Sequence, residues 1–227
     1  MLASNIMTRA RSVLQDSSGT RWSDSELLSW IGSGQRFIAI VRPDACSENA
    51  VLTLVAGTKQ TIPSDGFRLL DVMRNIKTDG TGGRVVRYCD REALDGTEPG
   101  WHYGTAKQEI RNYIYDNRDP LHFYTSPPAT TASKLEILYS KKPTDPTDST
   151  STLSISDLFE DPLLNYVLYR AYSKDAEVEQ NATLSAGYLS ACMSMLGVKT
   201  QKDAAFSPDL NSKGANPNVA ALQAGGV

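Results

Sequence analysis

The chain has 227 residues, of which 40% are hydrophobic and 22% charged, a composition typical of a globular protein and not of a disordered one. Its formal net charge of −3 argues against a surface built mainly to bind nucleic-acid phosphates, since such binding needs clustered Lys and Arg. No apolar run approaches the roughly 20 residues that span a bilayer, and the N-terminus lacks the apolar segment of a signal peptide, so cytoplasmic synthesis is expected.

Two helices are predicted in the first 43 residues. The weaker one runs from about Ala3 to Gln15 and ends at the polar run 16–19. The stronger one begins at Ser23, whose spacing to Glu26 is that of a capping box, and it ends at Pro43.

From residue 51 to about residue 139 the hydrophobic period changes from helical to two, which is typical of strands. Short strands are expected at 51–55, 60–62, 69–76, 84–88, 111–115, 121–124 and 135–139. Their number and spacing predict an antiparallel β-sandwich or barrel. Between the strands, Asp90 is expected to cap a helical turn. Trp101 is interpreted as a plug over the open end of the sandwich and not as a ligand platform.

Two further helices are predicted between Ser156 and Gly197. The first is capped by Ser156 or Asp157 and continues along an apolar line. The second is expected to bury one apolar face and to end at Gly197, where a left-handed cap favours glycine. These lines consist of Leu164, Leu168 and Ala171 in the first helix and Ala182, Ala186, Leu189, Met193 and Leu196 in the second. The short polar segment 175–181 between them predicts an antiparallel helical hairpin.

These elements predict an α+β fold in which an antiparallel bundle of four helices is interrupted by an inserted antiparallel β domain. The expected parts are the first half of the bundle at 1–45, the β domain at 46–150, the second half of the bundle at 151–197 and an extended C-terminal arm at 198–227. The arm has too few large apolar residues to form a core of its own, so it is expected to become ordered only against another chain. Its predicted anchors are Phe206, Leu210, Val219 and Leu222.

The sequence carries no recognisable catalytic, metal or cofactor motif. His102 and His122 lie in no known arrangement with a nucleophile. Cys46, Cys89 and Cys192 are widely spaced and form no CxxC pair, so reduced thiols are expected. Neither an enzymatic activity nor a bound cofactor or metal is expected.

One weak enzymatic alternative rests on carboxylates. Asp90, Glu92 and Asp95 stand near Trp101 and Tyr103, a combination of acidic and aromatic residues that could line a sugar-binding groove. Such clusters arise by chance in any chain with 26 acidic residues. The composition alone does not separate these readings.

Several stretches resemble the head-to-tail adaptor proteins of tailed bacteriophages, particularly those of short-tailed phages. They are 21–28 (RWSDSELL), 34–36 (GQR), 42–44 (RPD) and 168–175 (LYRAYSKD). The resemblance implies a virion component, a ring of about twelve copies below the portal that joins the capsid vertex to the tail. It also implies that the C-terminal arm docks onto the portal protein and that the β domain faces outward or toward tail components. Further implied partners are the tail nozzle or tube and the tail fibres, while genomic DNA passes through the ring without sequence-specific binding.

The residues of the predicted bundle fit such a ring. Small residues on its helices allow copies of the chain to pack closely, and charged residues are expected to pair between neighbouring subunits. The small residues are Ala171, Ala182, Ala186 and Ala191, and the charged candidates are Arg36, Arg170, Lys174 and Glu177.

A second functional reading remains open. A carbohydrate- or peptide-binding sandwich module of a virion tail component would need an exposed aromatic groove. Its candidate residues are Trp101, Tyr103, Tyr113 and Tyr115.

Overall fold

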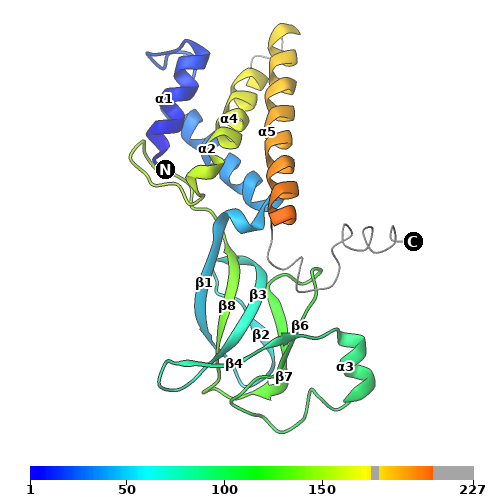
Figure 1. The fold of residues 1–227 in the computed structure, drawn as a ribbon. Helices are drawn as coiled ribbons and strands as arrows, with labels where there is room; N and C mark the ends of the chain where they lie inside the picture. Colours follow the sequence, from blue (N-terminus) through cyan, green and yellow to red (C-terminus); the bar gives the residue numbers. More distant parts are fainter. Residues whose placement is uncertain (175–178, 207–227) are drawn as a thin grey trace, which may run out of the picture. The chain divides into compact units, whose positions relative to one another are not determined.

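The computed structural model describes residues 1–174 and 179–206, and it has a mixed α+β fold (Figure 1). The chain divides into two compact units. The helical unit contains residues 1–34, 146–152 and the described residues from 157 to 206, and the β unit contains residues 35–145 and 153–156. The two units are defined by the contacts within each of them, which do not show that either unit folds on its own. The domain boundaries expected from the sequence therefore stay a prediction.

The first two helices start and stop where the sequence predicts. Helix α1 spans Ala3–Leu14 and helix α2 spans Asp24–Val41. The capping box of α2 is present, because the backbone N–H of Ser23 donates to Glu26 Oε2 at 3.1 Å and the N–H of Glu26 donates to Ser23 Oγ at 3.4 Å. Beyond α2, the short 3₁₀ helix η1 spans Pro43–Cys46.

A buried carboxylate organises the loop between α1 and α2. Asp16 accepts hydrogen bonds from the backbone N–H groups of Thr20, Arg21 and Trp22 at 2.9–3.1 Å. These bonds stabilise the charged form, so the pKa of Asp16 lies below its ordinary value, with the bond from Trp22 as the largest cause. The loop therefore holds Trp22 in place, and the indole Nε1 of Trp22 donates to the carbonyl of Ala171 at 3.2 Å.

Helices α4 and α5 form the predicted antiparallel hairpin. Helix α4 spans Glu160–Lys174 after the 3₁₀ helix η2 at Asp157–Phe159, and α5 spans Glu179–Phe206. Near their connection, the hydroxyls of Ser173 and Ser185 lie 2.7 Å apart. The rings of Tyr172 and Tyr188 stack with their centroids 5.6 Å apart.

Helix α4 also packs on α1 and α2. Arg9 of α1 forms ion pairs with Glu160 and Asp161 at the start of α4. Gly34 of α2 lies against α4, because a Cβ atom added there would come within 2.6 Å of a Leu163 methyl carbon. A larger residue at position 34 would require the side chains of α4 to shift, and α4 thus contacts α1, α2 and α5.

Two predictions for α5 are wrong. The expected apolar line is largely exposed at Ala182, Ala186 and Met193, while Ser185 and Cys192 are buried in its place. Burial of Ser185 is tolerated because its hydroxyl bonds to α4, including the carbonyl of Tyr169 at 3.3 Å.

The expected C-terminal end of α5 is also wrong. The helix passes through Gly197 and continues to Phe206, so the first part of the expected extended arm is helical. Gly in a helix costs about 1 kcal/mol relative to Ala, and the following Lys, Gln and Ala residues are good helix formers that offset this cost.

The β unit contains two four-stranded sheets, with strand orders β1-β8-β3-β4 and β2-β7-β6-β5. The strands are β1 Ser47–Thr53, β2 Gly57–Thr61, β3 Gly66–Ile76, β4 Gly82–Val85, β5 Arg87–Tyr88, β6 Asn112–Tyr115, β7 His122–Ala129 and β8 Lys134–Lys141. The strand expected at 84–88 is divided at Val86, and its two halves join different sheets.

One strand pair departs from the expected antiparallel arrangement. β5 pairs with β6 in parallel, while the other pairs are antiparallel. A parallel pair needs a long crossover, and the segment 89–111 provides it with helix α3 at Arg91–Thr97. Asp90 caps α3 as predicted, accepting the backbone N–H of Glu92 at 2.9 Å.

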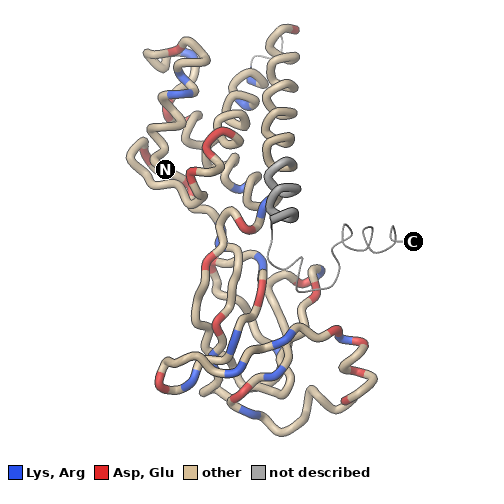
Figure 2. Tube along the Cα trace, in the orientation of Figure 1, with Lys and Arg blue, Asp and Glu red and all other residues tan. Residues whose placement is uncertain are grey.

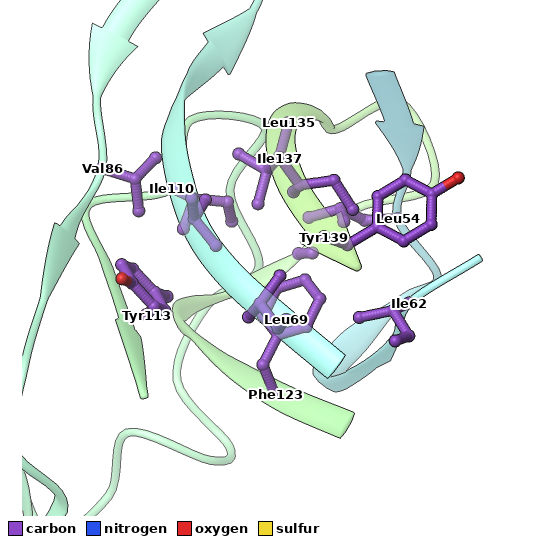
Figure 3. Packing of buried hydrophobic residues seen from close by; sticks show 12 residues of the cluster. Leu54, Ile62, Leu69, Val86, Ile110, Tyr113, Phe123, Leu135, Ile137 and Tyr139 are labelled. Carbon is purple, nitrogen blue, oxygen red and sulfur yellow. The ribbon is translucent and has the colours of Figure 1, made fainter. Parts of the chain in front are cut away.

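One hydrophobic core lies between strands of both sheets (Figure 3). It includes Leu69 of β3 and Ile137 of β8 from one sheet, and Tyr113 of β6 and Phe123 of β7 from the other. Burial of each such side chain contributes roughly 1.5–3 kcal/mol relative to exposure. The α+β class is thus confirmed, whereas the assignments as a four-helix bundle and as a sandwich or barrel stay predictions.

Two buried amide side chains bind backbone groups at the ends of strands. Gln60, 1% exposed, accepts the N–H of Val55 at 2.9 Å and donates to the carbonyls of Val55 and Gly57 at 2.9 and 3.0 Å. Asn75, 6% exposed, accepts the N–H of Ile110 at 2.8 Å and donates to the Ile110 carbonyl at 2.8 Å. Gln60 thereby fixes the β1–β2 connection, and Asn75 links β3 to the segment that leads into β6.

Candidate functional site

The charged residues expected at subunit contacts come from different elements of the chain. Arg36 on α2 forms an ion pair with Asp145 within the β unit. Arg170 is exposed on α4, and Glu177 lies outside the described residues. Contacts between subunits remain a prediction for these residues.

Lys174, the fourth charged candidate, has partners within its own chain. Its ammonium group donates to Glu26 Oε1 at 2.7 Å and to the carbonyl of Arg21 at 3.3 Å. The bond from Lys174 is the largest cause that holds the pKa of Glu26 below its ordinary value, followed by the backbone bond from Ser23. This ion pair joins the C-terminal end of α4 to the first turn of α2.

The predicted anchors of the C-terminal arm fall almost entirely beyond the described part of the chain. Phe206 is the last residue of α5. Leu210, Val219 and Leu222 lie outside the described residues.

A hollow of about 770 Å³ lies beside α3 and contains the acidic residues singled out in the sequence. Asp90, Glu92 and Asp95 line it, together with Asp116 and Asp119 from the β6–β7 turn. Several of these carboxylates are already engaged: Asp90 caps α3, and Asp95 accepts a hydrogen bond from Trp101 Nε1 at 2.8 Å. That bond is the largest cause that lowers the pKa of Asp95, whereas a glycosidase acid needs a raised pKa.

The aromatic groove required by a sugar- or peptide-binding module is not formed by its candidate residues. Trp101 is 3% exposed and packs against Leu94 and Ile114, and Tyr113 is 7% exposed. The expected role of Trp101 as a plug over the open end of the sandwich stays a prediction. Only Tyr103 of the candidates is widely exposed, at 85%. Buried rings offer no face for a ligand to stack on.

The two histidines have structural surroundings. His102 stacks on Trp101 with ring centroids 3.6 Å apart, and its Nδ1 lies 3.0 Å from the hydroxyl of Thr58. His122 Nδ1 lies 2.8 Å from Asp119 Oδ1 in the turn that leads into β7. Among the described residues, no carboxylate hydrogen-bonds to His102, so its contact with Thr58 lacks the orienting group of a catalytic triad.

The cysteines are free thiols, as expected. Burial raises the pKa of Cys46 and of Cys192 to about 11, so both are protonated at neutral pH, and Cys89 is half-buried. Within residues 1–174 and 179–206, no group of three or more His, Cys, Asp or Glu side chains is arranged to hold a metal ion.

Charge is distributed unevenly along the helices. Lys, Arg, Asp and Glu alternate along much of the chain (Figure 2), but no charged residue stands between Glu179 and Lys199 of α5. None of the helices that the structure describes is long and apolar enough to cross a membrane.

The uncharged stretch of α5 presents an exposed face opposite its contact with α4. We call this set of small residues the α5 outer face: Thr183, Ala186, Gly187, Ser190 and Ser194. Their spacing places them on one side of the helix, away from the buried Ser185, Cys192 and Leu196. Reasoning from apolar periodicity missed this face, although the long interval without charge was a visible signal.

Comparison with known proteins gives one family. A family model described as SU10 adaptor protein matches residues 1–212 of the chain. No curated protein matches it.

Proposed function

Because the chain belongs to the SU10 adaptor protein family, a family of phage head-to-tail adaptors, we propose that it is a structural subunit of the connector between capsid and tail. In this role about twelve copies form a ring below the portal, matching the portal's symmetry. The ring joins the capsid vertex to the tail and surrounds the path that DNA takes during ejection.

The match over residues 1–212 carries this proposal, since it includes residues of both the helical unit and the β unit. The role is architectural and not enzymatic. Its partners are the portal protein above, the tail nozzle or tube below, and the tail fibres where these attach to the connector.

Electrostatics are compatible with a DNA conduit. The net charge of −3 and the interspersed charges lack the concentrated Lys and Arg that would hold phosphates strongly (Figure 2). Each strong phosphate contact would retain the DNA, whereas a conduit must let it slide. DNA therefore passes without sequence-specific binding.

The C-terminal arm is proposed as the portal-docking segment. Phe206, Leu210, Val219 and Leu222 are its anchors, separated by small and polar residues that let a backbone approach a partner surface. Modest affinity per arm is multiplied around the ring through avidity.

Electron microscopy of the purified protein with and without purified portal rings tests the proposal. Added portal should acquire one extra ring of density with about twelvefold symmetry. A variant that ends at Phe206 keeps the whole of α5 and should fold normally but fail to attach. Portal that gains no density from the full-length chain would refute the adaptor role, and full attachment of the truncated chain would refute only the role of the arm.

The alternative of a sugar- or peptide-binding module is not proposed. The burial of Trp101 and Tyr113 removes two of the four rings that its groove needs.

A further inference from the structure

The edge strands of the β unit differ in how well they are protected from pairing with another chain. Among the described residues, the edges of the two sheets are β1, β4, β2 and β5. β2 contains a register irregularity between Gly57 and Lys59, and β5 has only two residues. β1 has seven residues, pairs regularly with β8 from Ser47 to Thr53, and contains neither Lys nor Pro. A long, regular edge without these residues is one that readily accepts a further strand.

Strands β1 and β4 are the two edges of one sheet, which has the order β1-β8-β3-β4. Each neighbouring pair in this sheet is antiparallel, so β1 and β4 run in opposite directions. When a second copy continues the sheet in the same order, its β1 stands beside β4 of the first copy and runs antiparallel to it. No strand has to reverse its direction for the sheet to pass from one copy into the next.

A single row of side chains crosses the outer surface of this sheet. From β1 to β4 it consists of Val51, Glu136, Arg74 and Val85, each opposite the next. The two charged residues in the middle form an ion pair with each other. The ends of the row are apolar and exposed, at 56% for Val51 and 57% for Val85. Pairing β4 of one copy with β1 of the next would bring these two valines together and remove both from water.

The backbone groups of both valines point to the free edges. The N–H of Leu54 donates to the carbonyl of Ser133, just before β8, at 2.9 Å. Backbone groups alternate in direction along a strand, so those of Val51 point away from β8. The N–H of Val86 donates to Met73 of β3 at 3.2 Å, so the groups of the adjacent Val85 point away from β3. Val85 of one copy and Val51 of the next can therefore exchange two N–H···O=C bonds.

We propose that β4 of one subunit pairs antiparallel with β1 of the next subunit, with Val85 directly opposite Val51. This inference rests on the proposed ring and names strands that join its neighbouring subunits. A second copy is the occupant because the two edges match in direction, in register and in the apolar character of the opposed side chains. The edges are different strands, so the contact is heterologous and repeats in one direction, whereas pairing β1 with β1 would give an isologous dimer.

Two opposite charges at the valines test the pairing. Val51→Lys places a cation opposite Glu136 of its own chain, and Val85→Glu places an anion opposite Arg74. Each new charge thus has a neighbour of opposite sign, and the thermal midpoint of the free chain should change little. In the proposed contact either single variant sets a charge against a valine, whereas the double variant sets two opposite charges against each other.

The readout is assembly on purified portal rings, measured by electron microscopy as the protein concentration needed for half-occupancy. Each single variant should raise that concentration about tenfold or more, and the double variant should recover most of the loss. Unchanged assembly of both single variants, or a double variant no better than the single ones, would overturn the pairing and leave the adaptor function standing. Failure of the wild type itself to assemble would instead refute the function.

Cross-linking identifies the paired strands directly. Val51→Cys and Val85→Cys are introduced separately in a Cys89→Ser background, because the other two native cysteines are buried. When the two variants are mixed on portal rings, a short bismaleimide should link one to the other, and neither variant alone should be linked. A product from Val51→Cys alone would indicate pairing of β1 with β1. That result, or no product from the mixture, would overturn the proposal.

Discussion

Replacing Asn75 with Ala should destabilise the β unit far more than the loss of one exposed asparagine would. Three hydrogen bonds disappear: those to the N–H and the carbonyl of Ile110, each 2.8 Å, and that to the carbonyl of Arg84, 2.9 Å. Ile110 is fully buried, so its two backbone groups would be left without partners at about 1–3 kcal/mol each. The Arg84 carbonyl adds less, because its bond to Asn75 is only partly buried.

The expected loss is therefore about 3 kcal/mol in the free energy of unfolding, measured by urea titration with hydrogen exchange of the peptide that contains Ile110. Asn49→Ala is the matched control, since Asn49 is an exposed asparagine on the outer surface of the same sheet and bonds to Glu136. That control should change stability by about 0.5 kcal/mol or less. An Asn75→Ala variant as stable as Asn49→Ala would show that these buried hydrogen bonds do not hold the segment.

Three further predictions concern burial and ionisation. Leu168→Ala should cost about 2–5 kcal/mol in the free energy of unfolding, because Leu168 is buried. Leu189→Ala should cost less, because Leu189 is only half-buried. Equal losses of the two variants in thermal or urea unfolding would contradict the observed register of α5. Folding lowers the pKa of Asp16, so the stability that this carboxylate contributes is present above the ordinary carboxyl pKa of about 4 and is lost as pH falls through the lower folded value. Asp16→Asn should therefore remove this part of the pH dependence of the thermal midpoint, which is measured between about pH 2 and 5. A variant with the same pH profile as the wild type would refute this prediction. At pH 8 a maleimide should modify Cys89 in the folded chain much faster than Cys46, whose pKa is raised to about 11 by burial. Peptide mass spectrometry measures the rate of modification at each cysteine. Equal rates at the two residues would contradict the burial of Cys46.

Local sequence rules predicted the features that local hydrogen bonds determine. The capping box at Ser23 and the cap at Asp90 involve partners within three residues, so their spacing alone predicts the helix starts. Pro43 marks the end of α2 for an equally local reason, since proline lacks an N–H and restricts the preceding residue.

Features determined by distant partners were not predictable in the same way. The rotation of α5 depends on Ser185 meeting α4 and on Tyr188 stacking on Tyr172, and apolar periodicity contains neither contact. The division of one expected strand at Val86 reflects the pairing of its halves with two different sheets. Such pairing is a property of the folded β unit and not of the segment itself.

The small residues expected at contacts between copies differ in exposure. Ala182 and Ala186 are exposed on α5, whereas Ala171 is buried within the chain, and contacts between subunits stay a prediction for them. Arg36 and Lys174 were expected to pair between subunits, yet each has a partner in its own chain. A single sequence does not tell which of several nearby carboxylates a long cationic side chain will reach.

The interruption of the helical unit by the β unit has a consequence for synthesis on the ribosome. The β unit has all its residues once the chain has been translated to residue 156, whereas α1 and α2 obtain their packing partner α4 only after residue 160. Until then Gly34 lacks its contact with Leu163, and Trp22 lacks the Ala171 carbonyl to which its indole donates. The first part of the chain to emerge is therefore among the last to complete its packing. The nascent chain must therefore keep its N-terminal helices from aggregating while the β unit folds, and pauses in translation before α4 would lengthen that exposure.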